Sequence, residues 1–260
     1  MSAAVRLSVF TLPEIQRLTS RDDLELERLG DRKQAIFCII PDSNDNSLNF
    51  LVGMLYTQAF QELYFQADKV QKGALKVPVR FLFDEFANVS LPDGYERLQS
   101  TMRSRNVMST IILQNISQLK ALFKDSWEGI IGNADCFLYL GGNEKESHKY
   151  VSDLLGKQSL TYRTTSMGRG RNGSMSTSTQ LMGRELMTPD EVRMLDNGKA
   201  IVLIRGEPPV IDDKYDLMAH PNIKETEDGG APPYVHRPGL SYALDDLPPF
   251  KSLDDFEIYE

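Results

Sequence analysis

The chain has 260 residues, of which 41% are hydrophobic and 25% charged, a composition ordinary for a soluble globular protein with one large domain and appendages. Its formal net charge is −8, but residues 224–260 hold nine acids against three bases, so residues 1–223 carry only −2. The overall charge therefore neither supports nor excludes nucleic-acid binding. No signal-peptide core is present at the N-terminus, and the most apolar stretch, residues 48–67, holds five polar side chains, which excludes a membrane span. We therefore expect a soluble chain that does not cross a membrane by itself.

The cysteines and histidines suggest no catalytic or metal centre. Cys38 and Cys136 each lie within an apolar run, which predicts buried free thiols in a reducing compartment. His148, His220 and His236 are scattered, and no Cys/His cluster has the spacing of a zinc site.

From residue 33 onward, short β-rich runs alternate with helical patterns. The predicted elements, in chain order, are a strand at 34–41, a helix at 47–68, a strand at 79–83, a helix at 94–105, a strand at 107–113, a helix at 116–123, a strand at 134–140, a helix at 144–155 and a strand at 199–205. Ser47 is the expected N-cap of the first helix, whose apolar contacts include Phe50, Met54, Leu55 and Phe60. This alternation predicts βαβ units, and hence an α/β fold with a mostly parallel, twisted sheet flanked by helices.

Three regions depart from this pattern. Residues 167–179 are rich in Gly, Ser, Thr and Arg and predict a mobile loop between two segments that could pair as an edge hairpin. Residues 221–260 predict an extended or disordered acidic tail that contains several prolines. Residues 1–30 resemble the end of a preceding domain more than the start of a fold, which leaves residues 31–220 as the expected α/β domain.

The apolar run Val79–Phe83 leads directly into two carboxylates, Asp84 and Glu85. In α/β sheets, ligands bind at the carboxyl ends of the strands. Phosphoryl-transfer enzymes place such a pair there, one carboxylate for Mg²⁺ and the other to orient or deprotonate the attacking water, as in a Walker B motif. The alternative is a strand that simply ends in solvated acids.

The next predicted strand ends in Gln114 and Asn115. An amide at the tip of a strand beside the acid pair is placed to sense a γ-phosphate or to hold the attacking water. The alternative is an amide that caps the following helix, which Asn115 alone could do.

Arg103 and Arg105 end the helix predicted between these strands. In ring-shaped ATPases such an arginine enters the site of the neighbouring subunit and neutralises charge in the transition state. The alternative is a basic helix C-terminus favoured by the helix dipole.

No G-x-x-x-x-G-K-[ST] occurs in the 260 residues, so the chain holds no Walker A loop to cradle a nucleoside triphosphate. Residues 168–173 match G-x-G-x-x-G, but no apolar strand precedes them and no apolar helix follows. They are therefore not a phosphate-binding loop, and their arginines could contact a nucleic-acid backbone or simply face solvent in a surface loop.

Taken together, the sequence resembles the type IV secretion coupling proteins, the TraG/TraD-like conjugative DNA-transfer ATPases. The resemblance covers about residues 5–220 in family order, and it is carried by the segments Ala35–Pro41, Asn49–Leu51, Tyr56–Gln58, Phe81–Asn88, Thr101–Arg105, Ile112–Asn115, Gln118–Leu119, Trp127–Asn133, Leu140–Gly142, Gly183–Glu191, Pro208–Pro209 and Lys214–Tyr215.

The resemblance implies a RecA-like P-loop NTPase fold and a homo-hexameric motor at the cytoplasmic face of the bacterial membrane. Such a motor uses ATP and Mg²⁺ to pass relaxase-bound single-stranded DNA to the channel proteins of the secretion system. By position, Asp84 would hold Mg²⁺, Glu85 would activate water and Gln114 would sense the γ-phosphate. Arg103 or Arg105 would be the arginine finger.

The family also has a membrane anchor, a Walker A loop and a helical domain ahead of this region. We therefore expect the anchor and the phosphate-binding loop to lie upstream or on another polypeptide, and the chain alone to be inactive. Two other functions remain open: a non-catalytic module that recruits relaxase, DNA or channel proteins, and an inactive remnant.

Overall fold

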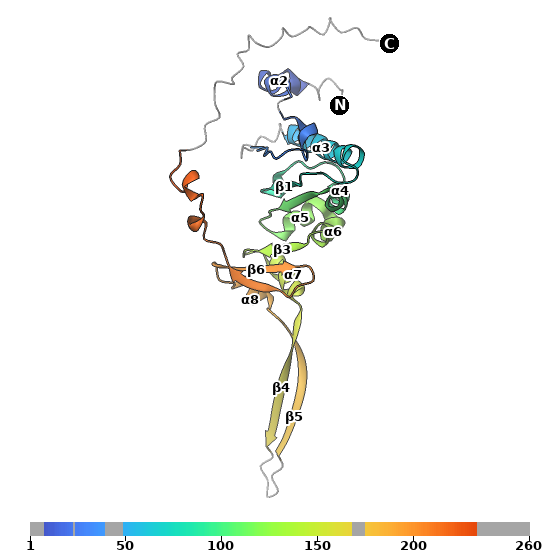
Figure 1. Ribbon diagram of the computed structural model, residues 1–260. Helices are drawn as coiled ribbons and strands as arrows, with labels where there is room; N and C mark the ends of the chain where they lie inside the picture. The colour runs from blue at the N-terminus through green and yellow to red at the C-terminus, as the bar shows by residue number, and fades with distance from the viewer. Residues whose placement is uncertain (1–7, 23, 40–48, 168–174, 233–260) are drawn as a thin grey trace, which may run out of the picture. The chain divides into compact units, whose positions relative to one another are not determined.

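The computed structural model describes residues 8–22, 24–39, 49–167 and 175–232 (Figure 1). The chain divides into a larger unit, residues 26–215, and a smaller unit formed by residues 1–25 and 216–260. In its described part the smaller unit holds only short helices, which are η1 (Ser8–Thr11), α2 (Pro13–Thr19), η8 (Leu217–Ala219) and η9 (Ile223–Glu225).

The larger unit contains helices that alternate with strands. Its helices are η2 (Leu26–Arg28), α3 (Asn49–Phe65), η4 (Gln66–Val70), η5 (Phe86–Asn88), α4 (Tyr95–Met102), η6 (Arg103–Arg105), α5 (Ile116–Phe123), η7 (Lys124–Ser126), α6 (Trp127–Gly132), α7 (Lys145–Leu155) and α8 (Pro189–Arg193). Its strands are β1 (Val79–Phe83), β2 (Val107–Ile111), β3 (Cys136–Tyr139), β4 (Lys157–Met167), β5 (Met175–Glu185), β6 (Lys199–Ile204) and β7 (Val210–Asp213). The helices and strands predicted from residue 49 onward are therefore confirmed, with ends that differ by a few residues.

Strands β1 and β2 are parallel and in register from Val79 opposite Val107 to Phe83 opposite Ile111. Both strands therefore end at the same edge of the sheet, which brings the residues that follow them close together. A second sheet has the order β3-β6-β7 and is antiparallel, and β4 and β5 form a separate antiparallel hairpin. The predicted α/β class is confirmed, while the parallel ladder is confined to β1 and β2 among the described strands.

The main core lies between the β1–β2 sheet and the helices α3, α4, α5 and α6. Alternate residues of β1 point to the same face, so Phe81 and Phe83 both face these helices. Phe83 lies within 6 Å of Phe86 and Tyr95, with ring centroids 5.6 and 5.9 Å apart, and Phe60 stacks on Phe81 at 4.4 Å. This aromatic packing fixes the end of β1, where the acid pair begins, because each buried ring contributes roughly 1.5–3 kcal/mol of hydrophobic stabilisation. A smaller core of Tyr139, Val151, Val192 and Ile201 joins β3 and β6 to α7 and α8.

The opposite face of these strands carries exposed apolar side chains. On β1 and β2, Leu82 is 65% exposed and Met108 39%. On β3 and β6, Leu138 is 53% exposed and Ile204 49%. We call these four residues the open face. No described helix covers them, although parallel strands such as β1 and β2 are ordinarily covered on both faces.

Several predictions about the apolar segments were wrong, for one shared reason. Cys38 and Cys136 are exposed rather than buried, and Met54 is 44% exposed. Residues 34–39 form no strand, and Phe37 is 85% exposed. An apolar side chain is buried only where a further layer covers it, and the described part of the chain supplies no such layer over these residues. Residues 34–39 also lack a neighbouring strand, whereas Cys136 lies in β3, which pairs with β6.

Two further predictions concern segments that border residues outside the described part. The predicted loop at 167–179 is shorter than expected, because β4 continues to Met167 and β5 begins at Met175. The hairpin of Thr/Ser-rich segments is confirmed. Ser47, the whole G-x-G-x-x-G segment at 168–173 and residues 233–260 of the acidic tail lie outside the described residues.

Candidate active site at the ends of strands β1 and β2

The acid pair lies in a tight turn directly after β1. Ile112 N–H donates to Phe83 O at 3.0 Å, and Phe86 N–H donates to Ile112 O at 3.0 Å, so backbone pairing continues on both sides of the two acids. Glu85 has φ 49°, in the left-handed region that non-glycine residues rarely adopt. Such a conformation costs roughly 1–3 kcal/mol, and residues of this kind cluster at functional sites. The turn is thus held by its neighbours in spite of its local strain.

Both oxygens of the Glu85 carboxylate accept a hydrogen bond from an amide side chain. Gln114 Nε2 donates to Oε1 at 3.2 Å, and Asn88 Nδ2 donates to Oε2 at 3.0 Å. Asp84 Oδ1 accepts from the backbone N–H of Glu85 at 3.1 Å. The structure therefore brings together Asp84, Glu85 and Gln114, which are separated by as many as 30 positions in the sequence. Asn88 was not predicted as a site residue, although it ends the Phe81–Asn88 segment of the family resemblance.

The two amides after β2 have different contacts. Asn115 Oδ1 accepts from Gln118 N–H at 3.0 Å and caps helix α5. The backbone N–H of Gln114 donates to Gln118 Oε1 at 3.0 Å, while the side chain of Gln114 points to Glu85. The alternative was that these amides only cap the following helix. Asn115 does supply that cap, whereas Gln114 faces the acid pair.

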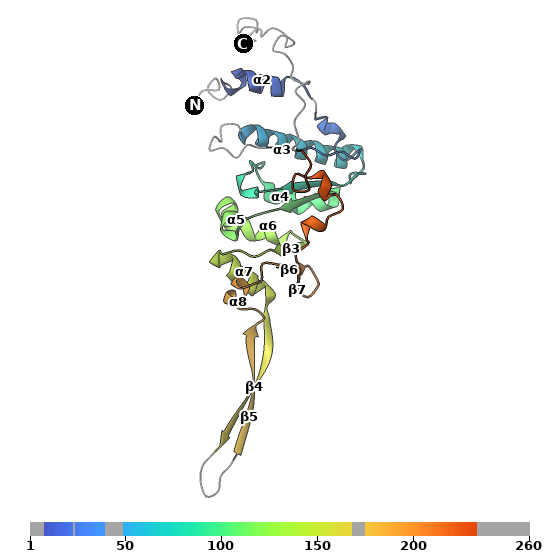
Figure 2. The same ribbon diagram turned by 90° about the vertical axis from the view of Figure 1, so that its left-hand side faces the viewer.

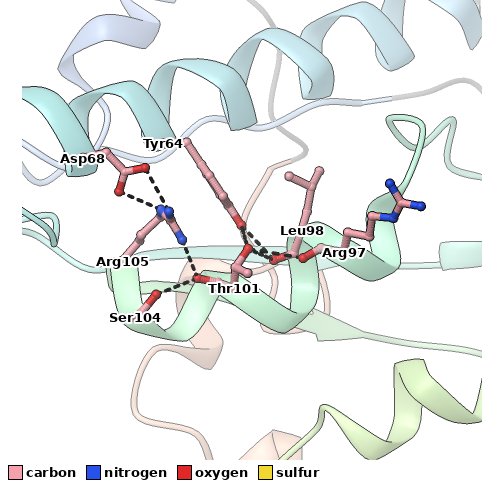
Figure 3. A network of polar contacts seen from close by, with 7 residues as sticks. All are labelled: Tyr64, Asp68, Arg97, Leu98, Thr101, Ser104 and Arg105. Carbon is pink, nitrogen blue, oxygen red and sulfur yellow. Dashed lines mark hydrogen bonds and ion pairs between the residues drawn. The ribbon is translucent and has the colours of Figure 1, made fainter.

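The arginines of η6 have opposite environments. Figure 3 shows that the guanidinium of Arg105 is enclosed by contacts: Nε and Nη2 donate to the two carboxylate oxygens of Asp68 at 2.9 Å each, and Nη1 donates to Thr101 O at 3.1 Å. Its Cζ lies 4.4 Å from the ring centroid of Tyr64, whose hydroxyl donates to Leu98 O at 2.8 Å. We call Tyr64, Asp68 and Arg105 the clamp, since they join α3 and η4 to the end of α4.

The hydrogen bonds from Arg105 hold the pKa of the Asp68 carboxyl below its usual range, and Asp68 raises the pKa of Arg105. Arg103, by contrast, has a side chain that is 83% exposed and a single loose ion pair, 3.8 Å from Nη1 to Asp135 Oδ1. Asp135 also pairs with Arg205 at 3.4 Å. Of the two arginines, Arg103 is the one whose guanidinium can reach another molecule.

The oxygen donors fit a nucleotide-dependent Mg²⁺ site better than a site built by protein alone. Among the described residues no group of three or more His, Cys, Asp and Glu side chains is arranged to hold a metal ion. Mg²⁺ commonly takes only one or two carboxylates and completes its octahedron with water and substrate phosphates. Asp84 could supply such a carboxylate, while Glu85 and Gln114 could hold a water molecule between an acceptor and a donor.

His148 takes no part in this arrangement. It is buried in α7 with Nε2 2.9 Å from Gly142 O, which is a structural contact. His236 lies outside the described residues. Within the described part of the chain, no helix has both the length and the hydropathy of a membrane span.

Comparisons with known proteins identify the family of the chain. The family model described as "Type IV secretory system Conjugative DNA transfer" matches residues 1–224. Two curated relatives from Agrobacterium fabrum (strain C58 / ATCC 33970) are 24% identical: Protein VirD4 over 207 residues, which are 78% of this chain, and Conjugal transfer protein TraG over 209 residues, which are 76%. The chain spans about 30% of the length of each of these relatives.

Among solved structures, the bacterial conjugative coupling protein TrwBdeltaN70, in its unbound monoclinic form, matches with a TM-score of 0.52 at 15% identity. The match covers 67% of this chain and 40% of that chain, and it supports a RecA-like P-loop NTPase fold. Because the family model matches far more than half of the residues, the chain belongs to the type IV secretion family of conjugative DNA-transfer coupling proteins.

Proposed function

We propose that this chain forms the Walker B half of an ATP-driven motor that transfers relaxase-bound single-stranded DNA through a type IV secretion channel. The observation that carries the proposal is the contact between Glu85 Oε1 and Gln114 Nε2, at the point where two parallel strands end. This pair can accept a proton from an attacking water and hold that water in line with a γ-phosphate. In this proposal Asp84 binds Mg²⁺ together with the phosphates of ATP.

The motor requires a phosphate-binding loop, which the 260 residues do not contain. The exposed face of the parallel β1–β2 pair supports the idea that a further α/β segment supplies this loop, because Leu82 lies exposed on a strand that such a segment would cover. We propose that residues 31–220 make up the nucleotide-binding domain, and that residues 221–260 are an acidic tail available to relaxase or channel proteins.

In a ring of subunits, an arginine from one subunit can complete the site of its neighbour. We assign this role to Arg103, since the guanidinium of Arg105 already donates from Nε, Nη1 and Nη2 within its own chain. The proposed assembly is a homo-hexamer at the cytoplasmic face of the bacterial membrane.

A second candidate is a non-catalytic module that recruits relaxase, DNA or channel proteins. The absence of a Walker A sequence from the 260 residues favours it, because a Walker B pair cannot bind a nucleotide in the usual way alone.

The experiment that tests the proposal is ATP hydrolysis by the purified chain, with and without single-stranded DNA, before and after addition of a relative's segment that carries the Walker A loop. We expect no turnover by the chain alone and turnover only in the complemented sample, lost in Glu85→Gln. Turnover by the chain alone that is lost in Glu85→Gln would show that another element replaces the loop. Absence of turnover in every complemented sample would favour the recruiting module.

A further inference from the structure

The β4–β5 hairpin is a two-stranded ribbon that neither candidate function explains. Its strands pair over 11 positions, from Lys157 opposite Glu185 to Met167 opposite Met175. Figure 2 shows that no helix covers either of its faces. An isolated two-stranded hairpin is at best marginally stable in water, so a ribbon of this length needs a partner that covers part of it.

The charge of this segment differs from that of the rest of the chain. From Lys157 to Glu185 the sequence has five bases and one acid, and two of the bases, Arg169 and Arg171, lie outside the described residues. The remaining residues hold 24 of the 29 bases and 36 of the 37 acids, a net of −12. A basic ribbon on an acidic protein is complementary to a polyanion.

One face of the ribbon has the chemistry of a phosphate-binding surface. Residues directly opposite each other share a face, and side chains alternate along each strand. The face that carries Arg163, which we call the Arg163 face, also carries the hydroxyls of Ser159, Thr161, Thr165, Thr177 and Thr179. Lys157 lies on this face too, directly opposite Glu185, and the exposed Leu181 lies opposite Thr161. Arg163 is therefore the cation of this face that has a hydroxyl, that of Thr179, rather than an acid opposite it. Arginine, lysine and Ser/Thr hydroxyls are the side chains that most often contact phosphate oxygens in nucleic-acid complexes.

The groups on this face are available for binding. Lys157, Ser159, Thr161, Arg163, Thr165, Thr177 and Thr179 are all exposed. By contrast, Arg184 on the other face forms an ion pair with Glu191 at 2.5 Å. Lys157 and Arg163 are six positions apart, about 20 Å along a strand, which is long enough for several consecutive phosphates.

We propose that the Arg163 face binds the phosphate backbone of a DNA strand, without reading its sequence. That the polyanion is DNA rests on the proposed function, whereas the binding of a polyanion at this face does not. The physical basis is charge neutralisation with release of counterions, so affinity falls as salt rises.

The test measures binding of a fluorescently labelled oligo-dT to the full chain by anisotropy, without nucleotide, between about 50 and 200 mM salt. The variant is Arg163→Glu, and the matched control is Lys149→Glu, which makes the same charge change at an exposed position of α7. We expect Arg163→Glu to weaken binding about fivefold or more at low salt and to lower the salt slope by about one, whereas Lys149→Glu leaves both nearly unchanged. Arg163→Lys should restore most of the affinity, because lysine also binds phosphate as a point charge.

Equal effects of Arg163→Glu and Lys149→Glu, or no binding by the unaltered chain at the lowest salt, would overturn the proposal. So would an unchanged DNA affinity of Arg163→Glu accompanied by loss of self-association in sedimentation velocity, since this would make the hairpin a protein interface. Far-UV circular dichroism and thermal unfolding of each variant show whether the fold is kept. Because binding is measured without nucleotide and the motor is tested by turnover, failure of this proposal is distinguishable from failure of the proposed motor.

Discussion

Arg105 and Asp68 form a two-pronged ion pair, with both nitrogen-to-oxygen distances at 2.9 Å, across the gap between η4 and η6. Planar guanidinium–carboxylate pairs of this kind fix orientation as well as charge. The pair sits beside the ring of Tyr64 and holds the short helix from which Arg103 extends. Arg105 therefore anchors this short helix, and Arg103 remains exposed.

This difference predicts opposite effects of two alanine variants. Arg105→Ala should lower the thermal unfolding midpoint of the isolated chain, because it removes the clamp and leaves Asp68 without its partner. Arg103→Ala should change that midpoint no more than an ordinary surface substitution does, since the side chain of Arg103 is 83% exposed. In an assembled, nucleotide-hydrolysing complex, Arg103→Ala should reduce turnover by about 10³-fold, as expected for an arginine finger. A larger loss of stability in Arg103→Ala than in Arg105→Ala would reverse our assignment.

The acid pair predicts a separation between binding and turnover. In an assembly that includes the phosphate-binding loop, Glu85→Gln should keep ATP binding and cut turnover by about 10² to 10⁴, the range for loss of a general base. Asp84→Asn should instead weaken the Mg²⁺ dependence of nucleotide binding, because the amide removes the charge that attracts the ion. Nucleotide binding by fluorescence and turnover by phosphate release measure the two effects separately. Unchanged turnover in Glu85→Gln would remove this residue from the role of base.

Gln114 and Asn115 provide a matched pair of neighbouring amides with different tasks. Asn115→Ala removes the N-cap of α5 and should lower the free energy of unfolding by about 0.5–2 kcal/mol. Gln114→Ala removes the contact with Glu85 and should reduce turnover in the assembled motor while it leaves stability nearly unchanged. Denaturant unfolding and hydrolysis assays on the same two variants test both statements. If Gln114→Ala were the more destabilising of the two, its side chain would have a structural task.

Much of the fold could be predicted because its signals are local. The run at 79–83 and the helix at 116–123 have the predicted bounds, since turn residues and apolar periodicity mark both ends. The meeting of Glu85 and Gln114 followed from a single rule, that parallel strands place their carboxyl ends at one edge.

What could not be predicted depends on partners in space. The segment at 34–39 is as apolar as a strand, yet no described strand pairs with it, and Cys136 lies exposed on a face without a covering layer. The clamp joins residues 37 positions apart, and sequence alone gives no signal that Asp68 selects Arg105 rather than Arg103. Local patterns specify elements, whereas side-chain partners depend on packing.

The open face predicts self-association of the isolated chain. Leu82 and Leu138 are exposed on strand faces, and large exposed apolar side chains favour association. The double variant Leu82→Thr/Leu138→Thr should therefore shift sedimentation velocity profiles toward monomer. As a control, Leu63→Thr alters a fully buried side chain of α3 and should unfold the chain rather than improve its solubility. Unaltered self-association of the double variant would show that the open face is not the surface responsible.

Tyr95 predicts a loss of stability at high pH. Burial against the aromatic core raises the pKa of its phenol from 10.0 to about 12. The folded state therefore holds this proton more tightly than the unfolded state does. The corresponding stabilisation is fully present below pH 10 and is lost as the pH rises toward about 12, with a total on the order of 3 kcal/mol for a shift of this size.

Denaturant unfolding between pH 8 and about 12 measures this dependence, and Tyr95→Phe is the control because it keeps the ring and removes the titrating proton. We expect the unaltered chain to lose stability more steeply than Tyr95→Phe above pH 10, while the two curves run parallel below it. In an alkaline absorbance titration, Tyr95→Phe should show one tyrosine fewer than the unaltered chain among those that ionise at the highest pH. Identical curves for the two proteins across the whole range would mean that Tyr95 ionises like an exposed phenol, and that the aromatic core at the end of β1 opens to water before the fold is lost.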